Sequence, residues 1–256
     1  MMTSNDLPRV ALCLSGQPRF FDKASSYFEK SVLSKFNCDV FLHTSFDESK
    51  VGQPYSCAAW NANSSDHYRQ DTISKLYETY RPVSFVVEPE HDVFPTPRNI
   101  ELYETKNTTE TTANITFSMF YSICKSLELA FEHEAKNNFK YDCVIRSRFD
   151  CAVDCDKLDF SNLKENTIYF NDCIRNARVM SDYFNFGTSD SMKTYSEIFK
   201  NIDRYWNNDN VLMCGEEMLT HHIAVKSKFN IMAVCATTHL IRDSEFNNKS
   251  FGRTWS

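Results

Sequence analysis

Residues 141–150, which read YDCVIRSRFD, decide how this chain is interpreted. Cys143, Val144 and Ile145 form an apolar run with β-branched members, which is typical of a buried strand. The run ends in an Arg-x-Arg-x-Asp pattern at 146–150. In open α/β sheets the carboxyl ends of the strands face the ligand crevice. The stretch therefore predicts a central strand whose charged end lies at a binding site.

Apolar runs alternate with helical spacing on both sides of this stretch. This alternation predicts an α/β fold with a central, mostly parallel sheet flanked by helices. We expect strands at 9–14, 39–43, 83–87, 141–149, 167–170, 183–187, 231–235 and 238–241, the last two closing the sheet. We expect helices at 24–36, 72–80, 115–137, 189–205 and 216–225. Residues 44–70 are predicted to be a long loop or an excursion from the fold, and 88–112 a long loop of the kind that forms a lid.

The composition narrows the class of protein. The chain has 256 residues, 42% of them hydrophobic and 24% charged, which predicts one globular domain. A net charge of -6 argues against nucleic-acid binding, which needs a basic face. We expect no transmembrane segment and no secretory signal, hence a cytoplasmic location. None of the ten cysteines forms a Cys-x-x-Cys pair, so reduced thiols are expected.

The Arg-x-Arg-x-Asp pattern supplies the first candidate site. Strand alternation places Arg146, Arg148 and Asp150 on one face. One carboxylate together with diphosphate oxygens commonly holds Mg²⁺ or Mn²⁺, and arginines compensate phosphate charge. The alternative is a structural salt bridge between Asp150 and one of the arginines.

A turn after the first predicted strand supplies further candidates. Ser15, Gly16, Gln17 and Arg19 belong to the sequence SGQPR at 15–19. Glycine would let backbone amides approach a nucleotide, and Arg19 could reach a phosphate. The segment has neither the Walker A ending nor Gly-x-Gly-x-x-Gly, so an ordinary strand-to-helix turn is the alternative.

Three acids in the second half of the chain are candidates for catalysis. Asp182 stands among aromatic residues before Gly187, a composition that suits either a sugar face or a core. Glu216 and Glu217 open a predicted helix, where acids also complement the helix dipole. A carboxylate within hydrogen-bond reach of an acceptor hydroxyl acts as a general base, and the spacing does not choose between Glu216 and Glu217.

Taken in order, these segments resemble glycosyltransferases of the GT-A type, in particular poorly characterised viral and bacterial glycosyltransferase-like proteins. The matching segments are Ser-Gly-Gln-x-Arg at 15–19, a strand ending in His-Thr at 39–44, Arg-x-Arg-x-Asp at 146–150, an Asp-x-Phe-x-x-Gly-like segment leading into a helix at 182–195, and Glu-Glu-Met-Leu at 216–219. The resemblance spans residues 9 to about 241. Its Asp-x-Asp, which binds metal and donor diphosphate, is Arg148-Phe149-Asp150 here, so either Asp150 alone holds Mn²⁺ or Mg²⁺, or Arg148 partly replaces the metal.

The resemblance implies a GT-A-like (Rossmann-like) single domain over 1–256, with a nucleotide-binding part at about 8–150 and an acceptor-side part at about 151–245. It further implies metal-assisted transfer of a hexose or pentose from a nucleoside-diphosphate sugar to a hydroxyl of a glycan or glycoprotein. The Asn-, Lys- and Phe-rich usage is consistent with an AT-rich genome, such as that of a large DNA virus acting in host cytoplasm. The alternatives are a non-catalytic glycan- or nucleotide-binding module and a sugar nucleotidyltransferase, although five glycines count against the latter.

Overall fold

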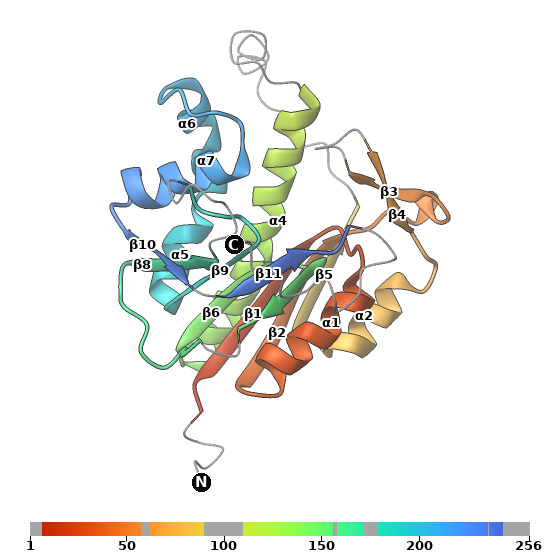
Figure 1. Ribbon diagram of the computed structural model, residues 1–256, viewed down its shortest axis with the longest axis horizontal. Coiled ribbons are helices and arrows are strands. Elements are labelled where there is room, and N and C mark those ends of the chain that lie inside the picture. The colour runs from red at the N-terminus through yellow and green to blue at the C-terminus, as the bar shows by residue number, and fades with distance from the viewer. Residues whose placement is uncertain are drawn as a thin grey trace.

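The centre of the molecule is a seven-stranded sheet in the order β10-β8-β9-β6-β1-β2-β5 (Figure 1). The computed structural model describes residues 7–57, 62–89, 110–155, 158–171, 179–234 and 236–242. The strands of the sheet are β1 (Arg9–Gly16), β2 (Asn37–Ser45), β5 (Ser84–Glu88), β6 (Cys143–Arg148), β8 (Thr167–Asn171), β9 (Phe184–Gly187) and β10 (Asn230–Val234). Among these described strands only β9 runs antiparallel to its neighbours. The predicted α/β class with a mostly parallel sheet is confirmed.

Four short strands lie outside the central sheet. β3 (Pro54–Cys57) and β4 (Ala62–His67) form an antiparallel pair, so of the two alternatives for 44–70 the structure shows an excursion, not a long loop. β7 (Cys151–Asp154) pairs with β11 (Thr237–Leu240) in a separate antiparallel ribbon. The prediction that 238–241 closes the central sheet is therefore wrong. The reason is the turn at Phe149 and Asp150, which ends β6 and starts a new strand.

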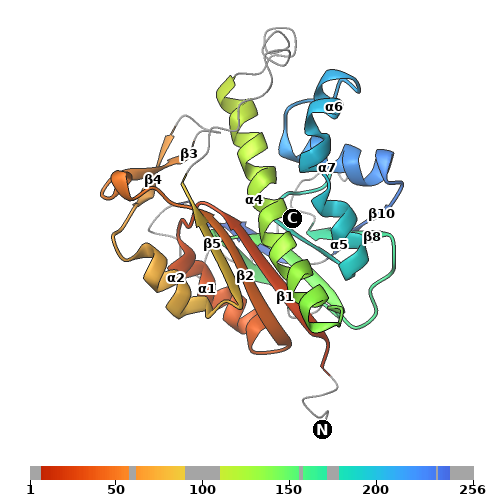
Figure 2. The ribbon, with the colours of Figure 1, turned by 180° about the vertical axis from the view of Figure 1, so that it is seen from behind.

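Helices cover both faces of the sheet (Figures 1 and 2). One face packs against α4 (Glu110–Asn137), α5 (Ser189–Ser196), α6 (Ile202–Asn207) and α7 (Gly215–Thr220). The other packs against α1 (Phe21–Phe28) and α2 (Thr72–Tyr80). Figure 2 shows the long helix α4 crossing the sheet in front of β1 and β2. None of the helices in the described ranges is long and apolar enough to cross a membrane.

Three of the predicted helices are interrupted. α1 passes into a π-helical turn at Glu29–Leu33, and α7 into another at His221–Lys226. A 3₁₀ turn at Phe199–Asn201 separates α5 from α6. At the first π turn, Ser31 donates to the Val153 carbonyl at 2.9 Å, which ties this turn to β7. Helix α4 begins at Glu110, earlier than predicted, and residues 90–109 of the predicted lid lie outside the described residues.

The apolar run of β1 explains why both faces are covered. Val10, Leu12 and Leu14 pack toward α1 and α2, whereas Ala11 and Cys13 pack toward α4. A parallel strand that is buried on both faces needs apolar residues at nearly every position. The cysteines whose side chains are described are free thiols, as expected, namely Cys13, Cys38, Cys124, Cys143, Cys151, Cys155 and Cys214.

The parallel strands define two ends of the sheet. We call the end with Gly16, Ser45, Glu88 and Arg148, the last residues of β1, β2, β5 and β6, the carboxyl edge. The opposite end, where β1 and β6 begin, is the amino edge. The sequence places its candidate ligand site at the carboxyl edge.

Candidate functional site

Asp150 is held by two arginines from distant parts of the sequence. Arg148 donates twice, from Nε to Asp150 Oδ1 at 2.7 Å and from Nη2 to Oδ2 at 2.8 Å. Arg19 donates from Nη2 to the same Oδ2 at 3.0 Å. The turn after β1 and the turn after β6 therefore meet through this carboxylate. Asp150 lies in the turn rather than on the strand, but the predicted pairing with Arg148 is present.

The two arginines keep Asp150 ionised. Burial alone raises the pKa of Asp150, but the charges of Arg148 and Arg19 and the Arg148 hydrogen bonds outweigh it, lowering the pKa to about 2. This geometry does not fit a divalent cation, because each carboxylate oxygen already accepts a hydrogen bond from a guanidinium. In the described ranges, no group of three or more His, Cys, Asp or Glu side chains could hold a metal ion.

Gly16 shapes the first turn of the site. Its φ of +105° belongs to the left-handed region, which explains the glycine. Its amide donates to Ser122 Oγ at 2.9 Å, and its carbonyl accepts from Thr44 Oγ1 at 2.9 Å. The Gly16 amide is thus already paired within the protein, and the approach of backbone amides to a nucleotide stays a prediction. What the glycine offers is space, because no atom lies within 4 Å of where a Cβ would be.

A buried histidine network that the sequence did not indicate supports this turn. His43 Nδ1 lies 2.8 Å from Ser122 Oγ, and its Nε2 lies 3.2 Å from Glu88 Oε2. Tyr121 donates to the same Glu88 oxygen at 2.9 Å. The network joins the ends of β1, β2 and β5 to α4. Nothing in the sequence distinguishes Ser122 or Glu88 from other polar residues, so only the fold reveals it.

Arg146 lies deeper than its two partners in the pattern. It is 1% exposed, and within the described part of the chain neither its Nε nor its Nη1 has a hydrogen-bond partner. Its neighbours across the sheet are Cys13 on β1 and Asn185 on β9. The buried Tyr195 hydroxyl lies beside it and donates to Asn185 Oδ1 at 3.0 Å. Arg146 therefore occupies the interior between the sheet and the α4–α7 layer, not the mouth of the crevice.

Asp182 lies beside this arginine, just before β9 begins. It is 6% exposed, and its Oδ1 has no partner among the described residues. Burial raises the pKa of Asp182, the charges of Arg146 and Arg148 oppose the rise, and Glu216 adds to it. A Cβ on Gly215 would lie 3.2 Å from Asp182 Oδ2, so a side chain there would crowd the carboxylate. Glycine thus allows α7 to begin against Asp182.

The structure separates the two neighbouring glutamates. Glu216 is half-buried and accepts a hydrogen bond from the Cys214 thiol at 2.9 Å. Glu217 is exposed. Burial and the nearby Glu216 raise the pKa of Cys214 to about 11, so this thiol stays protonated. The charge of Glu216 acts on Asp182, which in turn is affected by Arg146 and Arg148.

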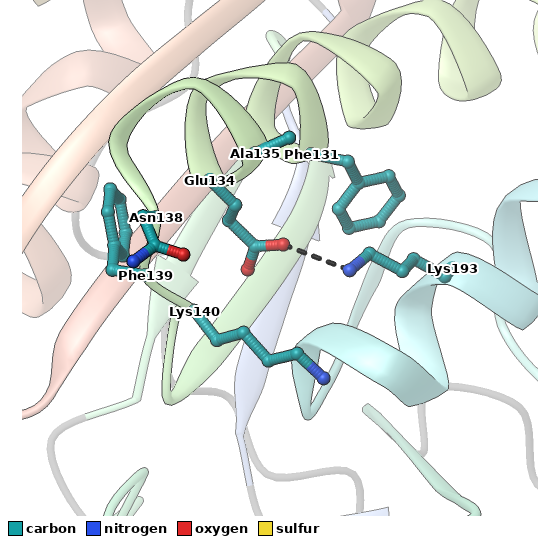
Figure 3. A pocket seen from close by; sticks show the side chains of 7 residues that line it. All are labelled: Phe131, Glu134, Ala135, Asn138, Phe139, Lys140 and Lys193. Carbon is teal, nitrogen blue, oxygen red and sulfur yellow. Dashed lines mark ion pairs between the residues drawn. The ribbon is translucent and has the colours of Figure 1, made fainter.

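An open hollow of about 370 Å³ lies elsewhere, at the amino edge. Figure 3 shows the side chains that line it, which are Phe131, Glu134, Ala135, Asn138, Phe139, Lys140 and Lys193. The buried Glu134 accepts from the Tyr141 amide, from Ser189 Oγ and from Lys193 Nζ, at 2.9, 2.9 and 3.1 Å. Because both carboxylate oxygens of Glu134 are paired within the protein, Glu134 is not left without a partner that a ligand in the hollow could supply.

Comparison with known proteins gives similarity in structure but not in sequence. By sequence, neither a protein-family model nor a curated protein matches this chain. By structure, the chain is similar to the apo form of the glycosyltransferase GlyE of Streptococcus pneumoniae TIGR4, with a TM-score of 0.40 and 10% identical residues. The match covers 88% of this chain and 45% of that one. This chain therefore spans less than half the length of the protein it matches.

Proposed function

We propose that this protein is a glycosyltransferase that moves a hexose or pentose from a nucleoside-diphosphate sugar to a hydroxyl of a glycan or glycoprotein. The observation that carries the proposal is the cluster at the carboxyl edge. There an arginine-rich group, Arg19, Arg148 and Asp150, lies next to a carboxylate pair, Asp182 and Glu216. Transfer from a diphosphate needs these two kinds of group side by side.

The arginine-rich group suits a leaving diphosphate. Two guanidiniums share one carboxylate, so a net positive charge is left. The Arg148 side chain is 21% exposed and can still present an N–H edge to a phosphate oxygen. Preorganised donors of this kind stabilise the charge that develops on a leaving group. In this proposal Asp150 orients the arginines.

The arginines take over charge compensation in this proposal, because the paired oxygens of Asp150 do not suit Mn²⁺ or Mg²⁺. The expectation of a metal held by Asp150 stays a prediction. A metal, if bound, would supply further positive charge to the diphosphate. Titration with Mn²⁺ and with a chelator tests it directly.

Glu216 is the proposed general base. It is half-buried and faces Asp182, whereas Glu217 is exposed. A carboxylate within hydrogen-bond reach of the acceptor hydroxyl takes its proton as the new glycosidic bond forms. The sugar passes from the diphosphate oxygen to the acceptor oxygen, and the diphosphate leaves with the bonding electron pair.

A second candidate is a binding module without turnover. The observation that favours it is the complete pairing of Asp150, which is also what a purely structural ion-pair network would show. The two candidates differ in product formation. A module would bind a nucleotide or glycan and leave it unchanged.

The first test is thermal denaturation with a panel of nucleoside diphosphates and their sugars, each with Mn²⁺ or with EDTA. Ligands that bind only the folded state stabilise it by about 2.7 kcal/mol at a hundredfold excess over Kd. We expect one base to raise the Tm, and mass spectrometry of acceptor glycans to show a sugar added. Arg148→Gln should lose the shift, and the control Arg9→Gln, at the amino edge, should keep it. No shift with any nucleotide would refute the proposal.

A further inference from the structure

Three buried polar side chains at the carboxyl edge lack partners. They are Arg146, through Nε and Nη1, Asp182, through Oδ1, and Ser15, through Oγ, and each atom is unpaired among the described residues. Each buried unpaired group costs about 1–3 kcal/mol. Native proteins pair the great majority of such groups, so atoms left unpaired among the described residues and gathered in one region are candidates for contact with a bound ligand.

The sheet brings these groups to the same side. Ser15 is opposite Arg148 across β1 and β6, and Cys13 is opposite Arg146. Because side chains alternate along a strand, Ser15, Arg146 and Arg148 face the α4 side together. Asp182 reaches the group from the start of β9, which pairs with β6. Gly215 leaves the room that Asp182 occupies.

The unpaired atoms are complementary to each other, yet no hydrogen bond joins them. Arg146 offers two N–H donors, and Asp182 offers an acceptor. Asn185 lies opposite Arg146 and donates to the carbonyl of Ser181, the residue before Asp182, so the two side chains belong to the same region. A group that fits between them must accept from the guanidinium and donate to the carboxylate. A hydroxyl does both, whereas a phosphate can only accept and would be repelled by Asp182.

We propose that Arg146 and Asp182, with Ser15, bind hydroxyl groups of the transferred sugar and so determine which sugar is used. This inference rests on the proposed function. There, the transferred sugar is attached to the diphosphate at Arg148 and attacked by the acceptor at Glu216. Asp182 is near both places, because Gly215, which precedes Glu216, packs against its carboxylate and Arg148 lies over the ring of the next residue, Tyr183. The pair thus acts on the sugar, in contrast to the expected roles of Arg146 at a phosphate and of Asp182 in catalysis.

The position of the pair also predicts selectivity. Both side chains are almost fully buried, with Asp182 6% and Arg146 1% exposed. A sugar that lacks the matching hydroxyl would bury the site and leave both side chains unpaired. Sites built to hydrogen-bond a hydroxyl reject analogues without it far more strongly than apolar pockets reject a missing methylene.

The test compares the intact protein with Asp182→Asn by calorimetry, using a nucleoside diphosphate from the thermal panel and the corresponding nucleotide sugar. We expect the sugar to tighten binding to the intact protein. Asp182→Asn should remove about ten- to hundredfold of that affinity and change diphosphate binding by less than about twofold. Glu134→Gln, the buried acid at the amino edge, is the matched control and should keep both affinities. An unchanged sugar increment in Asp182→Asn overturns the proposal and leaves the unpaired groups to internal water.

Two further measurements separate this inference from the proposed function. On the unmodified protein, nucleotide sugars with single hydroxyls replaced by hydrogen should show one position at which affinity falls by the same factor, and equal affinity for all of them would refute the inference. Free monosaccharides, followed by ligand-detected NMR, need no nucleotide site. If nucleotides fail to bind but a monosaccharide binds in an Asp182-dependent way, the sugar site stands and the transferase proposal falls. If neither binds, both fall.

Discussion

Each end of the sheet contains a buried acid, and the two acids, Glu134 and Asp182, differ in how completely the protein pairs them by hydrogen bonds. At the amino edge, Glu134 accepts hydrogen bonds from a backbone amide and a hydroxyl and pairs with Lys193. At the carboxyl edge, Asp182 keeps an oxygen with no partner among the described residues. The surface hollow is at the amino edge, but the buried polar atoms of Asp182 and Arg146 that lack hydrogen-bond partners among the described residues are at the carboxyl edge. A site for a polar ligand is better recognised by unsatisfied groups than by the shape of the surface.

The carboxyl edge repeats the contrast within itself. Asp150 is fully paired with Arg19 and Arg148, and its pKa falls to about 2. Asp182 is also buried near arginines, but its pKa rises, because burial outweighs charges that no hydrogen bond brings close. Asp150 is therefore paired by groups of the protein, whereas Asp182 has an oxygen without a partner among the described residues.

The largest effect should come from the proposed base. Glu216→Gln keeps the shape of the side chain and removes the proton acceptor, so turnover should fall by about 10²–10⁴-fold. Glu217→Gln, one residue away and exposed, should change it by less than about twofold. Steady-state kinetics with both variants checks this. Equal losses, or a loss only in Glu217→Gln, would show that the base is assigned to the wrong residue.

The next largest effect should be a loss of folding stability when Asp150 is replaced. Asp150→Asn leaves two arginines without their shared carboxylate, which should cost about 3–5 kcal/mol at neutral pH. The sign of the pH dependence follows from the lowered pKa. Asp150 stabilises the fold above the ordinary pKa of 3.8, and this contribution, about 2 kcal/mol, is lost as the pH falls toward 2. Urea denaturation from pH 7 to pH 2 should show this decline in the unmodified protein and a weaker one in Asp150→Asn.

A smaller effect is expected at the amino edge. Glu134→Gln disturbs the hydrogen bond from Ser189 and the ion pair with Lys193, and should cost about 1–3 kcal/mol. Because Glu134 is far from the proposed chemistry, turnover at a temperature where the variant is folded should not change. Thermal denaturation and a transfer assay on one preparation test both parts. If Glu134→Gln had normal stability but no activity, Glu134 would belong to the functional site and the distinction between the two edges would be wrong.

The fold was largely predictable because its central strands are apolar at nearly every position. The apolar runs RVALCL in β1 and CVI in β6 are short and contain β-branched residues, which favours buried strands over helices. The missed strands lack that signal. β4 has the sequence ANSSDH, which is polar throughout, and β7 follows β6 after only two residues, so the apolar pattern runs across the turn.

The site was predictable only in part, for a physical reason. The spacing of Arg148 and Asp150 places them within reach of each other, and they do pair. The Arg19 contact joins residues 131 positions apart, which no local pattern specifies. The depth of Arg146 and the role of Gly215 depend on how α4 and α7 pack onto the sheet. Spacing identifies residues that could act, but packing decides whether each one is satisfied.

The smallest effect should also be the most diagnostic, because its sign is unusual. The pKa of Asp182 is raised, so stability is greatest below the ordinary value of 3.8 and declines as the pH rises through the higher folded value. Burial thus disfavours the charged form of Asp182, and Asp182→Asn should gain about 0.5–2 kcal/mol at neutral pH. The gain should appear as a higher Tm at pH 7 and disappear near pH 3, the reverse of Asp150→Asn. If Asp182→Asn is more stable and has lost the preference for one sugar, Asp182 serves ligand binding at a cost in stability. A lower Tm at pH 7 would instead mean that Asp182 is a structural group like Glu134.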